Sequence, residues 1–565
     1  MSESSYWDRY NRKRLSRRRV LQSSGLGAAG LGAAALVGCG DDDKGSASPT
    51  SAGTKAGGAT AAATTAAAAA KPAGEIKVSV STLMEQSTSP FFQTGGGSFV
   101  IYSQAFEGFY NTGMEGTSEP RLATGMEQVD GQTIRFKLRP GTLFSDGTPV
   151  KMDDIKWSFD AYTTNDPLAA QAAGLKAAVD KIETPDESTV VVKFTRPIPF
   201  QMEELGVLGA SRGWPIASRA YYDKVGPDTF KTSPVTTGPW HITKNQVGQF
   251  VEMEANEAHY MKNLIPHAKT MRLNLVPEQQ TRLAQIKTGE ADIIEGIIGP
   301  AAESLKSEPS IKIMDTKNTA QLTVRFQDLW DNPAKGPQTD PRFREALNLS
   351  IDQEAVAKSL LKLGSPSPNI LLFPNSTGFD ANIFKARKRD VARAKQLMKE
   401  AGAEGTKMRL GAYKSSSYPL IPEVMQAYSG FWKEIGLETQ IEEKESGTYF
   451  TEFQKKTPRG LGAISFPNFS SGAILLVTYY KAGRQYSTMD NIPEIQAVIA
   501  ELEKEFDPQK QNALITKGMK IAYDNFLYVP CPYVDSLWAV GKKVKDWQRI
   551  AGIPYTNSLN TVTLA

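Results

Sequence analysis

Cysteine and histidine are scarce in this chain of 565 residues, which holds two cysteines and three histidines. Cys39 and Cys531 are too few for a disulfide framework, a four-cysteine zinc site or an iron–sulfur cluster. His241, His259 and His267 lack the spacing of a zinc-protease motif. The sequence therefore predicts a protein with no metal site and no other cofactor.

Net charge is also low, because 65 Lys and Arg residues stand against 61 Asp and Glu, a formal charge of +4. Residues 1–38 hold seven of the basic residues and two of the acidic ones, which leaves 58 basic and 59 acidic residues from position 39 onward. A nucleic-acid-binding face needs a basic surplus on the folded part of the chain. A surplus confined to one short segment favours a targeting signal instead, and no nucleic-acid partner is expected.

The N-terminal apolar run is short, covering the 14 residues 25–38, whereas a membrane-spanning helix needs about 20. Residues 16–22, Ser-Arg-Arg-Arg-Val-Leu-Gln, have the form of a twin-arginine export signal. The run ends in Leu-Val-Gly-Cys at residues 36–39, which resembles a bacterial lipobox. We expect residues 1–38 to be a twin-arginine lipoprotein signal peptide and Cys39 to carry the lipid. The alternative is an N-terminal anchor that is never cleaved.

Residues 39–74 contain almost no apolar side chain larger than alanine. Such a segment buries too little surface to offset its conformational entropy, so it is predicted to be a disordered tether. With the signal and lipid, it would hold the protein on the outer face of the bacterial cytoplasmic membrane. The folded body is expected to begin near Glu75 and to contain about 490 residues.

Strands and helices are both expected in the folded body, which predicts an α/β protein. Alternating apolar residues predict strands at 76–81, 133–138 and 189–194, and helical spacing predicts a helix at 153–162. Starting prolines and terminal glycines indicate further helices. These helices are expected at 341–363, 391–401, 422–435, 493–506 and 508–525, with strands at 269–276, 321–326, 408–412 and 438–441.

Several segments occur in the order typical of one family. Residues 135–150 read Arg-Phe-Lys-Leu-Arg-Pro-Gly-Thr-Leu-Phe-Ser-Asp-Gly-Thr-Pro-Val. Weaker matches lie at residues 106–110, 120–123, 237–240, 289–292, 340–347 and 394–402. Together they resemble the extracellular solute-binding proteins of ABC importers, peptide/nickel family (solute-binding family 5). Gly141 and Gly147 suit turns, and Arg342 and Arg344 are expected to make polar contacts at a helix start.

The resemblance implies a two-lobed clamshell like that of periplasmic binding proteins (type II, cluster C-like), with an extra subdomain in lobe I. Lobe I would comprise residues 75–107, 231–275 and 523–565, the extra subdomain residues 108–230, and lobe II residues 276–522. The resemblance further implies a monomer that binds a small solute between its lobes and delivers it to an ABC permease.

The chain departs from the family where peptide-binding members receive the peptide's ammonium group. In those members an acidic residue of lobe II makes that contact. Here Phe466 stands where the family usually has tryptophan, and Asn468, Phe469 and Ser470 stand where aspartate is expected. Because no carboxylate occurs between Glu452 and Asp490, a neutral, aromatic or sugar-like solute gains weight over an ordinary peptide.

Candidate ligand contacts follow from these positions. Backbone N–H groups at the start of a helix can bind a carboxylate or another polar oxygen, and the aromatic and amide side chains could line the cleft. The candidates are Gly96, Gly97, Ser98, Tyr102, Trp214, Phe466, Asn468 and Phe469. Core packing is the alternative for Tyr102, Trp214 and Phe469, and helix capping is the alternative for Ser98.

Two other functions stay open at this point. A secreted lipoprotein hydrolase would need a nucleophile–base or carboxylate pair, and the sequence contains no motif for either, so no enzyme is expected. A sensor with the same fold but no transport role cannot be distinguished by sequence. Cys531, which lies between two prolines, is predicted to be buried and inert.

Overall fold

The computed structural model describes residues 71–83, 88–89, 91, 96–164, 172–200, 214–331, 335–415, 418–484, 486–488, 492–553 and 555–565. For residues 96–99, 164, 173 and 174 it describes the backbone only. These residues belong to one unit, Lys71–Ala565. The predicted signal peptide, Cys39 and most of the predicted tether lie outside the described residues. Within the unit, the N–H of Ala73 donates to the carbonyl of His267 over 2.9 Å.

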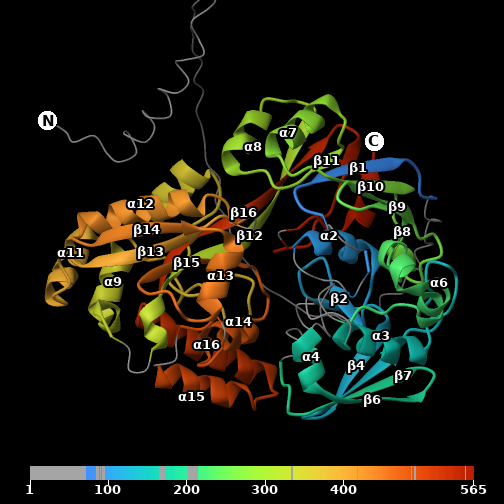
Figure 1. Cartoon of the computed structure of the whole chain (residues 1–565), viewed down its shortest axis with the longest axis horizontal. Helices are drawn as coiled ribbons and strands as arrows, with labels where there is room; N and C mark the ends of the chain where they lie inside the picture. The colour runs from blue at the N-terminus through green and yellow to red at the C-terminus, as the bar shows by residue number, and fades with distance from the viewer. Residues whose placement is uncertain are drawn as a thin grey trace, which may run out of the picture. The chain divides into compact units, whose positions relative to one another are not determined.

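A ten-stranded sheet organises the unit, with the order β14-β13-β15-β12-β16-β11-β1-β10-β9-β8. The long strands β12 (Ile311–Phe326) and β16 (Tyr528–Gly541) lie next to each other in the middle and run antiparallel. Figure 1 shows both strands running between two groups of elements. We call β11, β1, β10, β9 and β8 the first half-sheet, and β14, β13 and β15 the second half-sheet.

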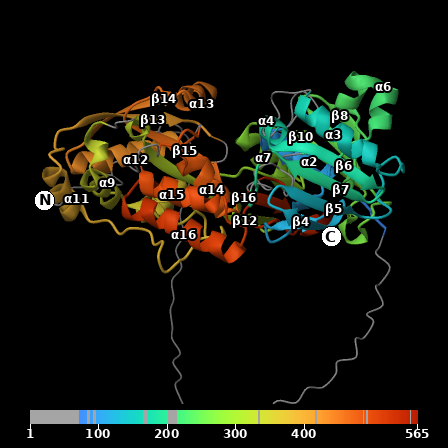
Figure 2. The same ribbon diagram turned by 90° about the horizontal axis from the view of Figure 1, so that it is seen from below.

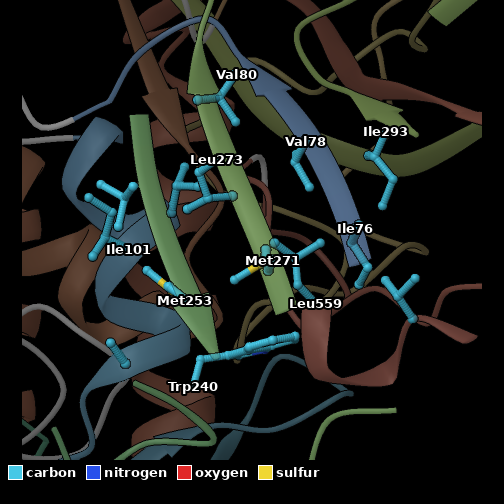
Figure 3. Packing of buried hydrophobic residues seen from close by; sticks show 14 of the residues in the cluster. Ile76, Val78, Val80, Ile101, Trp240, Met253, Met271, Leu273, Ile293 and Leu559 are labelled. Carbon is cyan, nitrogen blue, oxygen red and sulfur yellow. The ribbon is translucent and has the colours of Figure 1, made fainter. Parts of the chain in front are cut away.

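The first half-sheet comprises β1 (Glu75–Val80), β8 (Trp240–Gln246), β9 (Phe250–Ala255), β10 (Thr270–Leu275) and β11 (Ile293–Ile294). The predicted strands at 76–81 and 269–276 are therefore confirmed. Ile76, Val78 and Val80 are fully buried, and Figure 3 shows them beside Leu273 of β10 in one hydrophobic cluster. Helices α2 (Gly96–Ala105), α7 (Gln279–Thr288) and α8 (Gly299–Leu305) accompany this half, and the pair β17 (Val544–Asp546) and β18 (Thr563–Leu564) follows β16.

The second half-sheet comprises β13 (Lys407–Tyr413), β14 (Glu438–Lys444) and β15 (Leu461–Pro467). Four predicted helices are confirmed here, and they are α11 (Val391–Glu400), α12 (Ile421–Glu434), α15 (Pro493–Leu502) and α16 (Pro508–Asp524). Helices α13 (Ser446–Gln454) and α14 (Gly472–Tyr480) complete the layer. Short 3-10 turns lie at Lys262–Leu264, Gln327–Trp330, Pro337–Thr339 and Leu559–Thr561.

The single helix predicted for residues 341–363 is wrong. The structure has α9 (Pro341–Leu349), a short α10 (Gln353–Ala355) and a π-helix at Val356–Leu361. Asp352 adopts a non-helical conformation (φ −101°, ψ 84°), and its side chain accepts a hydrogen bond from the N–H of Ala355. Because aspartate is a strong helix N-cap, it ends the first helix and starts the next.

A separate four-stranded sheet has the order β4-β5-β7-β6. Its strands are β4 (Ala123–Asp130), β5 (Thr133–Leu138), β6 (Val179–Asp186) and β7 (Thr189–Phe194), and the bounds of β5 and β7 match the prediction. The hairpin β2 (Tyr110–Thr112) and β3 (Ser118–Pro120) precedes it, and α3 (Met152–Thr164), α4 (Ala172–Ala178) and α6 (Arg219–Thr232) complete this part of the chain (Figure 2). Phe109 and Phe136 stack at 4.5 Å in its core.

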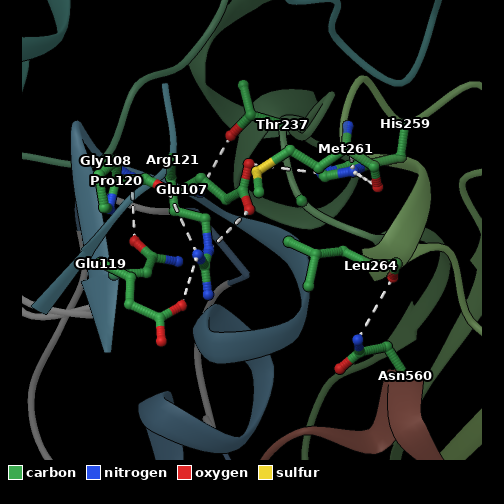
Figure 4. Close-up of polar contacts among 12 residues, drawn as sticks. Glu107, Gly108, Glu119, Pro120, Arg121, Thr237, His259, Met261, Leu264 and Asn560 are labelled. Carbon is green, nitrogen blue, oxygen red and sulfur yellow. Dashed lines mark hydrogen bonds and ion pairs between the residues drawn. The ribbon is translucent and has the colours of Figure 1, made fainter. Parts of the chain in front are cut away.

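The family-like segments make structural contacts with one another. Glu107 is buried, and its carboxylate lies 3.7 Å from Nε of Arg121 and 3.4 Å from Nε2 of His259, while the hydroxyl of Tyr260 also donates to it (Figure 4). The N–H of Glu107 donates to Oγ1 of Thr237 over 3.0 Å. Burial and the charge of Glu107 raise the pKa of Tyr260. This buried network holds three of the motif segments together.

The other motif predictions are confirmed as well. Gly141 and Gly147 have φ values of +71° and +82°, which favour glycine at these turns. Arg342 forms an ion pair with the helix-capping Asp340, and the buried Arg344 donates to carbonyls of Gln338, Thr339 and Asn525. Burial lowers the pKa of Arg344 to about 10. Cys531 is a free, fully buried thiol, and burial raises its pKa.

Candidate functional site

The carboxyl ends of the parallel strands β13 and β15 lie next to the place where β12 and β16 leave the second half-sheet. Pro467 at the end of β15 pairs with Ala320 of β12, and Ala320 pairs with Val534 of β16. In α/β sheets, ligands bind outside the carboxyl ends of the parallel strands. This edge is therefore the first place where a solute site is expected.

A cavity of about 480 Å³ lies at this edge. Residues from β12, from the loop before α11, from the position after β15 and from the segment after β17 line it. They are Met314, Asp315, Thr316, Lys317, Asn318, Pro374, Asn375, Asn468, Arg549, Ala551 and Gly552. Segments far apart in the sequence thus share one cavity, and we call it the Arg549 cavity.

Arg549 is held in place by neutral groups. Its Nε donates to Oγ1 of Thr316 over 3.1 Å, and its Nη2 donates to the carbonyls of Ile553 and Tyr555 over 3.1 and 2.8 Å. The guanidinium carbon lies 3.0 Å from the ring centre of Trp538. Its Nη1 is buried and has no hydrogen-bond partner among the described residues. Burial lowers the pKa of Arg549 well below its usual value, and the charge of Glu295 opposes that shift only in part.

Glu295 lies near Arg549, but its hydrogen bonds go elsewhere. One carboxylate oxygen accepts from the N–H and the hydroxyl of Ser81, each over 3.0 Å, and the other accepts from Oγ1 of Thr556 over 2.5 Å. Thr556 Oγ1 in turn accepts from the indole N–H of Trp538 over 3.2 Å. This carboxylate therefore fixes the end of β1 and the C-terminal segment that carries Arg549.

The crossing strand β12 is irregular where it borders the cavity. Its register against β16 shifts between Thr316 and Ala320, and Asn318 between them has a φ of +51°. Lys317 lies 2.5 Å from Asp315 and 2.9 Å from Asp535, and hydrogen bonds to both raise its pKa. The lysine is thus neutralised by its own neighbours, whereas the hydrogen-bond partners of Arg549 are uncharged.

Amide side chains form the opposite wall of the cavity. Nδ2 of Asn468 donates to the carbonyl of Asn318 over 2.8 Å and to Oδ1 of Asn375 over 2.9 Å. Gly552 faces both amides, because a Cβ at this position would lie 3.2 Å from Nδ2 of each. The exposed Asn375 therefore has its Nδ2 directed toward the segment that carries Arg549.

The structure does not bring the predicted ligand residues together. Asn468 lines the Arg549 cavity, but Tyr102 and Trp214 lie in separate hydrophobic clusters, each at most 1% exposed. The hydroxyl of Tyr102 donates to the carbonyl of Ser89, and the indole N–H of Trp214 donates to the carbonyl of Ile155 over 3.1 Å. A binding role for these two rings stays a prediction without support from their packing.

The remaining predicted residues occupy three other settings. Phe466 is 4% exposed, and its ring meets Tyr479 edge-on at 4.4 Å. Phe469 follows Asn468, and its carbonyl accepts from the hydroxyl of Ser376 over 2.6 Å. Gly96, Gly97 and Ser98 form the first turn of α2, for which the backbone alone is described. Their roles in binding remain predictions.

Sequence reasoning missed Arg549, Asn375 and Asn318. None of them lies in a recognised motif, and the signal that marks Arg549 is its contact with Trp538 and Thr316, two residues distant in sequence. Within the described residues, no group of three or more His, Cys, Asp or Glu side chains could hold a metal ion. None of the described helices is both long and apolar enough to cross a membrane.

A larger hollow, of about 540 Å³, lies on the first half-sheet. Its lining comes from β1, β9, β10, α7 and their adjoining loops, and it includes Lys77, Phe250 and Arg272. Arg272 already forms an ion pair with Glu252 at 2.5 Å and stacks on Phe250 at 3.5 Å. Since its charged groups satisfy one another, this hollow is a weaker candidate than the Arg549 cavity.

Comparisons with known proteins agree with the resemblance seen in the sequence. Residues 117–484 match the family model described as bacterial extracellular solute-binding proteins, family 5 Middle. The chain is 25% identical over 339 residues to the glutathione-binding protein GsiB of Escherichia coli K12, covering 60% of this chain and 63% of that protein. It is 25% identical over 360 residues to the dipeptide-binding protein of the same organism, covering 59% and 65%. The matched region thus spans less than two thirds of either relative.

The fold comparison covers more of the molecule. The solved structure of HbpA2 from Haemophilus parasuis matches with a TM-score of 0.75 at 18% identity, covering 87% of this chain and all of that one. The predicted α/β fold of the cluster C periplasmic binding proteins is thereby confirmed. The family consists of binding proteins rather than enzymes, in agreement with the expectation of no catalytic site. The chain belongs to the bacterial extracellular solute-binding proteins, family 5.

Proposed function

We propose that this protein is the substrate-binding component of an ABC importer for peptides or related solutes, and that it binds its solute in the Arg549 cavity. The observation that carries the proposal is the origin of the cavity lining. Asn468 follows β15 of the second half-sheet and Asn375 lies in the loop between the π-helix and α11, whereas Arg549 and Gly552 follow β17, beyond the crossing strands. A solute bound here would contact both parts at once.

The crossing strands would supply the hinge of such a protein. Two register shifts interrupt the pairing of β12 with β16, between Thr316 and Ala320 and between Gln321 and Thr323. A ligand drives closure only by binding the closed state more tightly than the open one. Contacts from both sides of the cavity to one solute would provide that preference. The sequence suggested lobe II at residues 276–522, but β11 at residues 293–294 pairs with β1 in the first half-sheet, so we propose that lobe II begins later, within β12.

Binding of a solute can be tested by thermal unfolding of the purified protein with pools of short peptides, oligosaccharides and organic acids. A ligand present at 100 times its Kd stabilises the folded state by about 2.7 kcal/mol, which shifts the unfolding transition measurably. The proposal predicts such a shift with at least one pool. If every pool leaves the transition unchanged at millimolar concentrations, the proposal is wrong.

The export route and the anchor are separate parts of the proposal. Residues 16–22 would direct the chain to the twin-arginine pathway, and Cys39 would receive the lipid that holds a monomer beside its permease. Replacing Cys39 by Ala is expected to move the exported protein from the membrane fraction to the soluble fraction. Replacing Arg17, Arg18 and Arg19 by Lys is expected to retain it in the cytoplasm. Unchanged membrane attachment of the Cys39→Ala protein would contradict the lipid anchor.

A further inference from the structure

The unused hydrogen-bond donor of Arg549 is the starting point. Thr316, Ile553 and Tyr555 satisfy Nε and Nη2, whereas Nη1 is buried without a partner among the described residues. A buried donor left unpaired costs about 1–3 kcal/mol, and more when the group is charged. A hydrogen-bond acceptor that a bound solute brings to Nη1 would remove that cost, and a negatively charged one would remove the most.

The charge of the lining favours the same kind of group. Three charged residues line the cavity, namely Asp315, Lys317 and Arg549. Lys317 pairs with both Asp315 and Asp535, at 2.5 and 2.9 Å, whereas Arg549 hydrogen-bonds only to neutral groups and has the charge of Glu295 nearby, so Arg549 is the lining cation that can still pair with an anion. Guanidinium groups match carboxylates particularly well, because two parallel N–H donors meet two oxygens.

The side-chain amides of Asn375 and Asn468 add a neutral hydrogen-bond donor to the cavity and no negative charge that would repel an anion. Both hydrogens of Asn468 Nδ2 are engaged, with Asn318 and Asn375. Nδ2 of Asn375 points toward Gly552, at the rim of the cavity. The strand end that carries Asn468 has no acidic residue, since none occurs between Glu452 and Asp490. The site therefore offers donors to an anion and no carboxylate on this strand for a solute's ammonium group.

We propose that the Arg549 cavity binds the carboxylate of the solute, with Nη1 of Arg549 as the charged donor and the amide of Asn375 as a second donor. This inference rests on the proposed function and names its substrate class, a carboxylate-bearing solute that needs no ammonium group. A peptide C-terminus and a sugar acid present the same chemistry to these two side chains.

The test compares solutes with and without a free carboxylate. The purified protein is incubated with yeast extract that is untreated, methyl-esterified to block carboxylates, or acetylated to block amines. Retained compounds are then released by denaturation and identified by mass spectrometry. We expect the untreated and acetylated extracts to yield retained acids and the esterified extract to yield none. Identification of the retained acids separates peptides from sugar acids.

Each other outcome has a definite meaning. Equal retention from the esterified extract, or retention of compounds that carry no carboxylate, would overturn the inference and leave the proposed function standing. Loss of retention after acetylation would overturn the claim that no ammonium group is needed. No retention from any extract would contradict the proposed function itself.

Variants locate the carboxylate within the cavity. Asn375→Asp adds a negative charge at an exposed rim position, so folding should be unaffected, and the affinity for a retained acid should fall about tenfold or more. Asn382→Asp makes the same change at an exposed residue outside the lining and should leave the affinity unchanged. Arg549→Met should abolish binding of the acid. An Asn375→Asp protein that binds the acid as tightly as the Asn382→Asp control would show that the carboxylate lies elsewhere.

Discussion

Two arginines, the partly buried Arg549 after β17 and the fully buried Arg325 on β12, occupy opposite kinds of surroundings. Arg549 makes three hydrogen bonds to neutral oxygens, stacks on Trp538 and lines a cavity. Arg325, on the part of β12 that pairs with β15, is fully buried and donates from Nη1 to the carbonyl of Tyr486 over 2.5 Å. Its Nε and Nη2 have no partner among the described residues.

Aromatic rings take the place of hydrogen-bond acceptors around Arg325. Its guanidinium carbon lies 4.4 Å from the ring centre of Tyr528, 4.8 Å from that of Phe466 and 5.5 Å from that of Tyr479. A desolvated cation–π contact contributes about 2 kcal/mol, whereas the desolvation of a buried ion costs several kcal/mol. The comparison indicates that burial alone does not reveal what a charge contributes. Arg549 links chain segments, whereas the contribution of Arg325 to stability should be near zero.

Arg549→Met should have the largest effect on stability. The substitution removes the hydrogen bonds to Thr316 and to the carbonyls of Ile553 and Tyr555, of which the second keeps its bond from Nδ2 of Asn557, and the loss should cost about 3 kcal/mol. Urea unfolding followed by circular dichroism, without solute, measures this loss. Lys545→Met, at an exposed position of the preceding strand β17, is the control and should unfold as the unmodified protein does. An unchanged midpoint for Arg549→Met would remove the distinction between the two arginines.

Replacing Arg325 by Met should leave the stability of the protein unchanged or increase it. Methionine keeps much of the side-chain volume and removes a buried charge, so Arg325→Met should be neutral or should stabilise the protein by up to about 2 kcal/mol. Arg325→Ala is the matched control, because it removes the charge but leaves a cavity and should destabilise the protein by about 2–4 kcal/mol. If Arg325→Met costs as much as Arg549→Met, the aromatic surroundings hold the cation more strongly than we infer.

The predictability of the fold from sequence differed between these regions for a physical reason. Strands β5 and β7 match their predicted bounds because apolar and polar residues alternate along each strand, as they do in a strand with one buried face. Strand β16 was not predicted, since Pro530 and Pro532 argue against a central strand, and residues 528–534 are buried on both faces. Its pairing with β12 is a contact between distant segments, which local patterns do not encode.

The residues of the candidate site also fall into two groups, those that the sequence could predict and those that it could not. Asn468 could be predicted because it follows a strand at the position where the family carries an acidic residue. Arg549 could not, because its segment has no periodic pattern and its burial arises when Trp538 of β16 packs against it. Family-like positions were thus accessible from sequence, whereas the charged group that distinguishes this cavity depends on tertiary contacts.

Gly552→Ala tests whether the solute binds beside Gly552 in the Arg549 cavity. Gly552 has a φ of +71°, where an alanine costs about 1–2 kcal/mol, and the new Cβ would lie 3.2 Å from Nδ2 of both Asn375 and Asn468. Gly483→Ala carries a similar φ, +74°, but its Cβ would meet nothing within 4 Å. Both variants should lose similar stability in urea unfolding, and Gly552→Ala alone should weaken solute binding measured by calorimetry. Equal binding by the two variants would place the solute away from Gly552.

The smallest predicted effects come from two threonines of β12, one beside each arginine. Thr316 accepts from Nε of Arg549, so Thr316→Val leaves a charged donor unpaired and should cost about 1–2 kcal/mol. The hydroxyl of Thr323 is buried and has no partner among the described residues, so Thr323→Val should be neutral or slightly stabilising. Since both changes replace a hydroxyl by a methyl group on one strand, their difference in urea midpoint isolates the hydrogen bond. Equal midpoints would mean that the bond to Thr316 contributes nothing and that carbonyl contacts alone hold Arg549.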